Sequence, residues 1–343
     1  MAGMSMMGQP ARLFKALTTP GMRAQIKHLT KSASNLQRPT NGDNVFLFST
    51  PRSGSTWLME LILSQPGFRA CDQPMDIRNP YVQRHLGISG WTELYQKDAE
   101  ERLKPYLQDI CDGRLRGLTT LWNHHRFLSK RLVFKIQNGW QERVGWMRDA
   151  LGGRVVLLLR HPIAVTVSRK QLPRLETFVE SDYALRFDND IKKLAAKIID
   201  TGSFFEKGIL HWCFENAVPL QSIESDWTVL TYEQIVVDPE TALGVLSSRL
   251  KLPDPAAMMK QIALPSRTTG KSNVETQSLV ASSDRERLIS KWRKQVSSDQ
   301  ERIAFEITDA FGIDIYKAGR DMPVDDILFR PDHALPAPKF AEH

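Results

Sequence analysis

The chain has 343 residues, of which 41% are hydrophobic and 25% are charged, a balance that is ordinary for a soluble globular protein. Lys and Arg outnumber Asp and Glu by 46 to 39, which gives a formal net charge of +7 at pH 7. This positive excess suits an anionic ligand, a nucleic acid or an anionic membrane surface, and by itself selects none of them. Three scattered cysteines without a CxxC spacing indicate neither a disulfide framework nor a structural zinc site. We expect buried thiols in a reducing compartment at Cys71, Cys111 and Cys213.

Residues 1–42 form a basic N-terminal arm in which every charged side chain is Lys or Arg. Leu13, Phe14 and Leu17 stand among these charges, so three interpretations are open: an amphipathic segment on a membrane surface, a transit peptide and a partly ordered arm. We favour the partly ordered arm. A secretory signal is disfavoured because no apolar core is followed by a small-residue cleavage site. The longest uninterrupted apolar run, 155–159, is too short to span a membrane.

Residues 45–63 predict a buried strand, a tight loop and a helix. Four apolar residues at 45–48 favour a parallel strand, and the apolar positions after Trp57 recur at helical spacing. The loop contains Arg52, Gly54 and several hydroxyl side chains, and its backbone N–H groups at a helix N-terminus would favour a phosphate. It is not a Walker A loop, because Gly54 is followed by Ser55 and no Lys is in place. Taken alone, the loop also fits an ordinary strand-to-helix turn.

The remaining chain alternates between expected strands and helices. Strands are expected at 131–136, 155–159 and 227–232, and a short extended piece at 118–122. Helices are expected at 92–112, 140–151, 182–218 and 240–250, with one or two closing helices at 285–311. Residues 69–76 are expected to be a short segment outside these elements. The alternation predicts an α/β fold of three layers, with a central parallel sheet flanked by helices in one domain at 43–320 and a Pro-rich surface tail at 321–343.

Several strand ends carry basic or hydroxyl side chains: Arg52–Thr56, Lys135, Arg160 with Ser168, and the late loop Arg267–Lys271. In a parallel sheet these groups converge on one edge. Guanidinium, ammonium and hydroxyl donors around a backbone cradle suit a ligand with two separate phosphate-type groups. Read singly, Arg160 fits a helix-flanking surface charge and Lys135 a solvated strand end, but the set as a whole favours the ligand site.

Two of these stretches resemble motifs of sulfotransferases that use 3′-phosphoadenosine 5′-phosphosulfate (PAPS). Thr50–Leu58 resembles the family's 5′-phosphosulfate loop, and Val155–Ser168 resembles its 3′-phosphate motif, with the Arg and the Ser at the family's spacing. Thr231–Glu240 is similar to the usual strand and following helix, and Arg267–Lys271 resembles, less closely, the late loop that closes over the nucleotide. The resemblance covers 44–316 and is to the carbohydrate-type and bacterial branch of the family. The Pro-Arg-Ser-Gly-Ser form resembles that of members acting on a hydroxyl of a glycan, lipid or small metabolite rather than on a phenol.

The resemblance implies a P-loop-NTPase-like fold and in-line sulfuryl transfer from PAPS without a metal. Positioning and charge stabilisation supply most of such catalysis. Arg52 stands where many members have Lys and is assigned to electrostatic stabilisation, and Lys135 falls where some members contact the sulfuryl group. The expected residues for the 5′ side of the nucleotide are Arg52, Ser53, Gly54, Ser55, Thr56 and Trp57. The expected residues for the 3′-phosphate are Arg160, Ser168, Arg267, Gly270 and Lys271.

The general base departs from the family pattern. Phenol and steroid sulfotransferases carry His where this chain has Gln137, and carbohydrate-type members often carry Glu where it has Gln73. A neutral amide cannot take a proton. Asp72 is the nearest substitute, followed by Asp76 and the pair His124–His125. An ordinary turn residue at 72 and a surface pair at 124–125 are the competing interpretations.

The sequence therefore predicts a sulfotransferase acting on a hydroxyl of a glycan, lipid or small metabolite. The alternatives are a nucleotide-binding module without transferase activity and a P-loop kinase, which needs a Walker Lys and a carboxylate for Mg²⁺. Nucleic-acid binding is not expected, because no recognised module or interleaved aromatics accompany the basic charge. We expect a cytoplasmic protein whose basic arm can reach a membrane surface. The sequence identifies neither the acceptor nor the oligomeric state.

Overall fold

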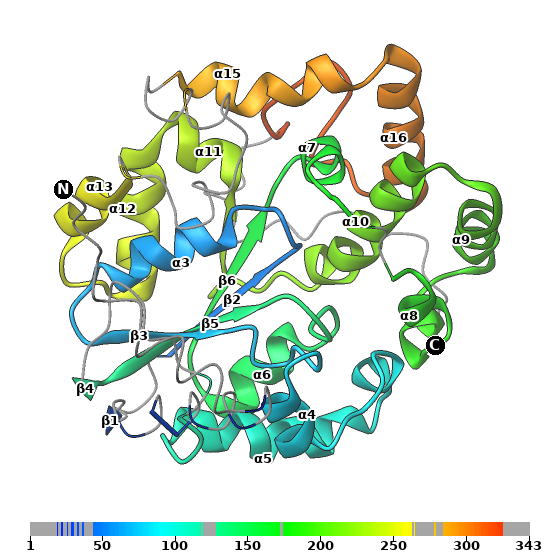
Figure 1. Cartoon of the computed structure of the whole chain (residues 1–343). Coiled ribbons are helices and arrows are strands. Elements are labelled where there is room, and N and C mark those ends of the chain that lie inside the picture. The colour runs from blue at the N-terminus through cyan, green and yellow to red at the C-terminus, as the bar shows by residue number, and fades with distance from the viewer. Residues whose placement is uncertain are drawn as a thin grey trace, which may run out of the picture.

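The computed structural model describes residues 44–116, 128–171, 174–262 and 284–324, with single positions at 19, 22, 26, 29, 30, 33, 36, 37, 118, 264 and 278. Five parallel strands form the central sheet in the order β3-β5-β2-β6-β7 (Figure 1). Their bounds are β2 (Val45–Ser49), β3 (Phe68–Asp72), β5 (Arg131–Ile136), β6 (Arg154–Leu159) and β7 (Thr228–Thr231). A separate two-stranded sheet pairs β1 (Leu36–Gln37) with β4 (Leu128–Ser129).

Helices cover both faces of the sheet. They are α3 (Ser55–Leu63), α4 (Pro80–Leu86), α5 (Ala99–Cys111), α6 (Val144–Leu151), α7 (Pro162–Val167), α8 (Glu176–Val179), α9 (Asn189–Thr201), α10 (Phe204–Gln221), α11 (Tyr232–Val237), α12 (Pro239–Leu250), α13 (Pro255–Ile262), α15 (Arg285–Ser290) and α16 (Ser298–Ala310). The described ranges also contain the short 3-10 helices η2 (Thr92–Tyr95), η3 (Asp182–Arg186) and η5 (Lys291–Gln295). The predicted α/β class, with a parallel sheet between helical layers, is confirmed.

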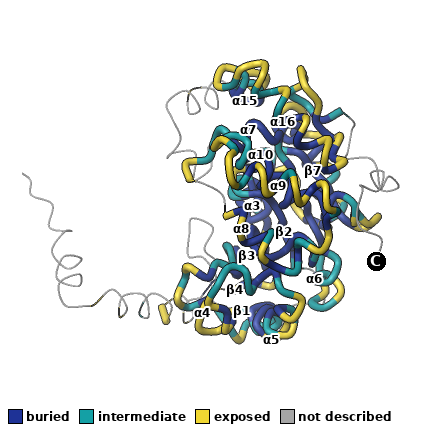
Figure 2. Tube along the Cα trace, turned by 90° about the vertical axis from the view of Figure 1, so that its right-hand side faces the viewer, coloured by how far each residue is buried: buried dark blue, intermediate teal, exposed yellow. Residues whose placement is uncertain are grey.

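Strand β2 shows how the two-residue period of a strand divides the core. Val45 and Leu47 pack with α3, α12 and α13, whereas Phe46 and Phe48 face the opposite side with α5, α6 and α10. Every residue of β2 is buried, which is expected of a central parallel strand covered on both faces. Figure 2 shows the strands buried in the interior, with the exposed positions on the peripheral elements.

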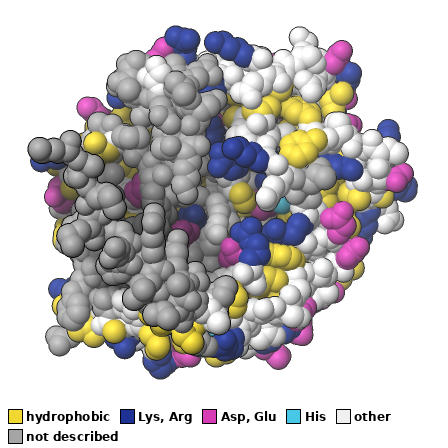
Figure 3. Space-filling view, in the orientation of Figure 1, with side chains coloured by type: hydrophobic (Ala, Val, Ile, Leu, Met, Phe, Trp, Pro, Cys, Tyr) yellow, Lys and Arg dark blue, Asp and Glu magenta, His cyan; other side chains and the backbone are white. Residues whose placement is uncertain are grey.

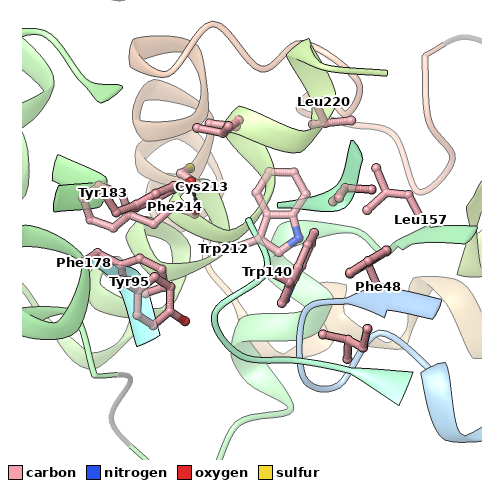
Figure 4. Close-up of a cluster of buried hydrophobic side chains, with 14 of the residues drawn as sticks. Phe48, Tyr95, Trp140, Leu157, Phe178, Tyr183, Trp212, Cys213, Phe214 and Leu220 are labelled. Atoms are coloured by element: carbon pink, nitrogen blue, oxygen red, sulfur yellow. Dashed lines mark hydrogen bonds between the residues drawn. The ribbon is translucent and has the colours of Figure 1, made fainter. Parts of the chain in front are cut away.

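Aromatic side chains fill the larger of the two core clusters. The Phe48 and Trp140 ring centroids lie 5.4 Å apart, and Phe178 stacks on Phe214 at 5.3 Å. Figure 4 shows Trp140 and Trp212 between Phe48 and the group that includes Phe178 and Phe214. This packing fixes α10 against the sheet beneath the loop that follows β2.

The predicted strands at 45–48, 131–136, 155–159 and 227–232 are confirmed with small shifts at their ends. Strand β3 was not predicted, because Arg69 and Asp72 interrupt its apolar pattern. It forms through pairing with β5, in which Asp72 lies opposite Lys135. Edge strands depend more on tertiary pairing than on their own sequence.

Three predicted helices are wrong in their extent. The helix expected at 92–112 is η2 followed by α5, and that expected at 140–151 begins only at Val144. The long segment at 182–218 is divided into η3, α9 and α10. Its main break has a local cause, because the Ser203 side chain caps α10 in a reciprocal capping box with Glu206. The closing segment at 285–311 holds α15, η5 and α16.

The remaining predictions fall largely outside the described residues. Of the expected extended piece at 118–122, only Leu118 is described, and most of the N-terminal arm and of the tail at 321–343 lie outside. The division into arm, domain and tail therefore stays a prediction. All three cysteines are free and buried, as expected.

Candidate functional site

The loop after β2 enters α3 with a backbone that only a few residues tolerate. Gly54, the N-cap of α3, has φ +89°, and Arg52 has φ +80°. No side chain caps α3, so the first-turn N–H groups have no intrahelical or side-chain acceptor. The Ser53 hydroxyl is fully buried and has no hydrogen-bond partner in the described part of the chain. An open helix N-terminus beside an unpartnered hydroxyl can hold an anion, and we call this place the cradle.

Arg160 lies directly beside this loop. Its Nη1 donates to the Arg52 carbonyl oxygen at 2.8 Å, and its guanidinium carbon lies 4.2 Å from the Tyr232 ring centroid. The Trp212 indole N–H donates to the Arg160 carbonyl oxygen at 3.0 Å. The sequence predicts Arg160 at a second phosphate site, separate from the loop after β2. In the structure Arg160 contacts this loop, because β2 and β6 are neighbouring strands.

Gly54 makes this arrangement possible. A Cβ atom at this position would lie 2.7 Å from Tyr232 Cδ2, closer than carbon atoms normally approach. Trp57 contacts the same Tyr232 ring edge to face, with centroids 5.8 Å apart. Gly54, Tyr232, Arg160 and Trp57 are therefore one packed unit along the edge of the loop.

Lys135 bridges the loop and the edge strand. Its Nζ lies 2.7 Å from Asp72 Oδ1 and donates to Thr56 Oγ1 at 3.2 Å. Its side chain is 6% exposed, whereas that of Asp72 is 22% exposed. An ammonium at this depth, held by a carboxylate and a hydroxyl, has a fixed position at the mouth of the cradle.

The two glutamines that replace the expected bases meet in space. Gln73 donates to the side-chain oxygen of Gln137, and Gln137 Nε2 donates to Ser55 Oγ at 3.1 Å. Gln73 adopts φ +54°, which turns the chain directly after Asp72. This amide chain holds the ends of β3 and β5 against the first residue of α3, but neither amide can accept the proton of an acceptor hydroxyl.

A buried polar cluster on α10, behind the loop, was missed by the sequence analysis. Asn216 Nδ2 donates to Thr50 Oγ1 at 2.9 Å, and Glu215 lies 3.4 Å from His211 and 3.8 Å from Arg169. Burial raises the pKa of Glu215 to about 8, although Arg169 opposes the shift. Burial lowers the pKa of His211 well below its usual value, and Arg169 adds to this lowering. The signal in the sequence that could have revealed this cluster is the set of polar residues within the otherwise apolar run of α10.

A second buried carboxylate fixes the turn after Arg160. Glu233 accepts the His161 backbone N–H at 3.1 Å and the Tyr316 hydroxyl at 2.8 Å. Burial raises the pKa of Glu233, and burial lowers the pKa of His161 to about 3. The His161 ring stacks on Trp292 at 4.4 Å, so neutral aromatic packing surrounds the turn. The C-terminal segment thereby anchors the strand end that delivers Arg160.

The other sequence-predicted residues divide into three groups. Ser168 lies at the C-terminal end of α7 and donates to the Val165 carbonyl oxygen at 2.8 Å, without a described contact to Arg160. Asp76 is ion-paired with Arg78 at 2.7 Å. Five candidates lie outside the described residues, namely His124, His125, Arg267, Gly270 and Lys271.

Burial also affects the loop arginine. Burial lowers the pKa of Arg52, and the nearby charge of Arg160 adds to this lowering. Arg52, Arg160 and Lys135 thus place three positive charges around one cradle. Among the described residues, no group of three or more His, Cys, Asp and Glu side chains is arranged to hold a metal ion. Helices in the same ranges are all too short or too polar to cross a membrane.

No known family profile matches the chain, and no curated protein matches its sequence. Among solved structures, the sulfotransferase domain of the Synechococcus PCC 7002 olefin synthase is 15% identical, covers 82% of this chain and 100% of its own, and gives a TM-score of 0.43. The sulfotransferase domain of the curacin biosynthetic pathway is 18% identical over 79% of this chain and 98% of its own, with a TM-score of 0.38. Mouse sulfotransferase SULT7A1 complexed with PAP is 14% identical over 83% and 88%, with a TM-score of 0.38. At these identities no family is assigned, and the function is inferred from the residues of the site.

The close approach of Gly54 to Tyr232 predicts a measurable cost for a single methyl group. We expect Gly54→Ala to lower the free energy of unfolding by about 1–2 kcal/mol from backbone strain alone, with a further loss from the contact with Tyr232. Gly87→Ala is the matched control, since Gly87 has φ +68° and open space around its missing Cβ. Urea unfolding of both variants measures the difference. Equal losses would show that Tyr232 does not press on the loop.

The raised pKa of Glu215 predicts a pH dependence of stability. Between its unfolded value and about 8, the folded protein holds a proton that the unfolded chain releases, so stability falls as pH rises through this range. In Glu215→Gln we expect the free energy of unfolding to fall less steeply with pH, by up to roughly 1 kcal/mol per pH unit. Urea unfolding at pH 5 and pH 8 measures it. The depressed pKa of His211 acts with the opposite sign in both proteins, so identical pH dependence would contradict the assignment.

Proposed function

We propose that the protein is a PAPS-dependent sulfotransferase that acts on a hydroxyl acceptor. The hydrogen bond from Arg160 to the Arg52 carbonyl oxygen carries this proposal, because it joins two cationic positions to one helix N-terminal cradle. A nucleotide with phosphate-type groups at both its 5′ and its 3′ positions fits such a pair. Trp57, packed beside Tyr232, offers an aromatic surface on the same edge.

The residues present suit both ends of PAPS. The N–H groups of the loop after β2 and the buried Ser53 hydroxyl would hold the 5′-phosphosulfate, and Arg160 would hold the 3′-phosphate. Ser168 and the late loop at 267–271 are further proposed partners of the 3′-phosphate. PAPS supplies the activated sulfuryl group, and the protein supplies orientation and positive charge.

In the proposed reaction, the acceptor oxygen attacks sulfur while the bond from sulfur to the 5′-phosphate oxygen breaks. Arg52 stabilises the charge that develops on the leaving phosphate and cannot act as an acid, because a guanidinium does not lose its proton. Lys135, whose Nζ lies 2.7 Å from Asp72 Oδ1, would stabilise the charge on the sulfuryl oxygens. Asp72 takes the acceptor's proton, since its carboxylate is more exposed than Lys135 and lies next to the cradle.

A nucleotide-binding module without transferase activity is the second candidate. The Gln73–Gln137 contact favours it, because amides occupy both positions at which the resemblance places a base. A P-loop kinase is disfavoured by the sequence of the loop, in which Ser55 follows Gly54 where a Walker loop has Lys.

The transfer reaction is tested with labelled PAPS and a panel of hydroxyl acceptors, with sulfated products identified by mass. We expect product with the full chain, and we expect Arg160→Ala to raise the KM for PAPS by about 10- to 100-fold, since a hydrogen bond to a charged group contributes about 1.5–3 kcal/mol. Arg302→Ala, on the exposed face of α16, is the control and should leave KM unchanged. Binding of PAP without product from any acceptor would favour the binding module.

The proton acceptor is tested by Asp72→Asn, which keeps the shape of the side chain and removes its basicity. We expect kcat to fall by about 10²- to 10⁴-fold while the affinity for PAP is retained. The matched control is Asp149→Asn, at an exposed carboxylate paired with Arg148 at 2.8 Å. Full activity of Asp72→Asn would transfer the role of base to Asp76, His124 or His125.

A further inference from the structure

A second group of basic side chains lies beyond the proposed nucleotide site. The guanidinium carbon of Arg174 lies 3.9 Å from the Trp91 ring centroid, and that of Arg78 lies 6.0 Å from the same centroid. Arg174 Nη2 donates to Asn138 Oδ1 at 3.2 Å. Figure 3 shows Lys and Arg side chains gathered near the middle of the face that it presents. We call Arg174, Arg78 and Trp91 the Trp91 group.

The Trp91 group is connected to the reacting end of the site. Asn138, the partner of Arg174, follows Gln137, whose amide bonds to Ser55 at the start of α3. Burial lowers the pKa of Arg174, and the charge of Arg78 contributes to the lowering. Burial lowers the pKa of Arg169, and the charges of Arg174 and Arg52 add to this lowering. The charges of Arg174, Arg169 and Arg52 therefore act on one another, and Glu215 opposes their effect at Arg169 and Arg174.

Arg174 has no carboxylate within 4.0 Å in the described part of the chain, whereas Arg78 is paired with Asp76 at 2.7 Å. A guanidinium placed over a ring keeps its in-plane N–H groups accessible, and those of Arg174 that do not donate to Asn138 are left for an anion. The same stacking covers one face of Trp91, so that face cannot receive a sugar or aromatic ring. A charged group of the ligand is what this arrangement can bind.

We propose that the Trp91 group binds an anionic substituent of the acceptor, a carboxylate, sulfate or phosphate, while the hydroxyl to be modified lies at Lys135 and Asp72. The acceptor class is therefore an acidic hydroxyl compound. This proposal rests on the proposed sulfotransferase function, because only a transferase has an acceptor. The anion site itself requires only Arg174, Trp91 and their neighbours.

The test uses the full chain labelled with ¹⁵N-tryptophan and saturated with PAP. The indole signal of Trp91 is identified among the 8 tryptophans by its loss in Trp91→Phe. Sodium glucuronate, sodium sulfate and sodium phosphate are each titrated, and methyl glucoside is the neutral match for glucuronate. We expect at least one of the anions to shift the Trp91 signal saturably, and methyl glucoside not to.

Arg174→Gln keeps a hydrogen-bond donor for Asn138 and removes the charge. It should weaken the anion response of Trp91 by about 10-fold or more, as expected for a lost charge-assisted hydrogen bond, while Arg302→Gln should not alter it. A Trp91 signal that ignores every anion, or that responds equally in Arg174→Gln, would overturn the proposal.

Affinity for PAP is measured first in the same samples. Failure to bind PAP would contradict the proposed function. The anion titration of the free protein would still show whether the Trp91 group binds an anion. Normal PAP binding together with a Trp91 signal that no anion shifts would contradict the anion site at the Trp91 group and leave the proposed function standing.

Discussion

The parallel pairing of β2 with both β5 and β6 is the constraint on which the site depends. It places the end of the central strand between the end that carries Lys135 and the end that carries Arg160. Lys135 then contacts Thr56 in the first turn of α3, and Arg160 contacts the Arg52 carbonyl oxygen in the loop after β2. A one-residue slip of either neighbour would turn its basic side chain toward the opposite face of the sheet.

The loop itself combines openness to a ligand with tight packing behind it. The first N–H groups of α3 have no side-chain cap and the Ser53 hydroxyl has no hydrogen-bond partner in the described chain, yet Gly54 lies directly against Tyr232. Below the loop, Asn216 holds Thr50 from the buried helix α10. Rigid support under unpartnered donors is what an anion site needs, because an ordered cradle binds without paying for its own ordering.

The sequence was sufficient to predict the parts of the site that are local. The strand at 45–48, the loop with Gly54 and the helix after it lie within one short stretch, and their apolar pattern and turn chemistry agree. Strand β3 could not be predicted, because it depends on pairing with a strand about sixty residues away. The contact between Gln73 and Gln137 was hidden for the same reason, although each had been noted singly. The stacking of Arg174 on Trp91 left no pattern in the sequence.

We propose that two anion sites, the cradle and Arg160, bind one nucleotide together. The most direct test is a calorimetric titration of the full chain with 3′-phosphoadenosine 5′-phosphate, compared with adenosine 5′-phosphate and adenosine 3′-phosphate. If each site holds one phosphate, removal of either phosphate weakens binding by about 10- to 100-fold. Equal affinity for the bisphosphate and adenosine 5′-phosphate would contradict the role of Arg160, and no binding of the bisphosphate would contradict the account as a whole.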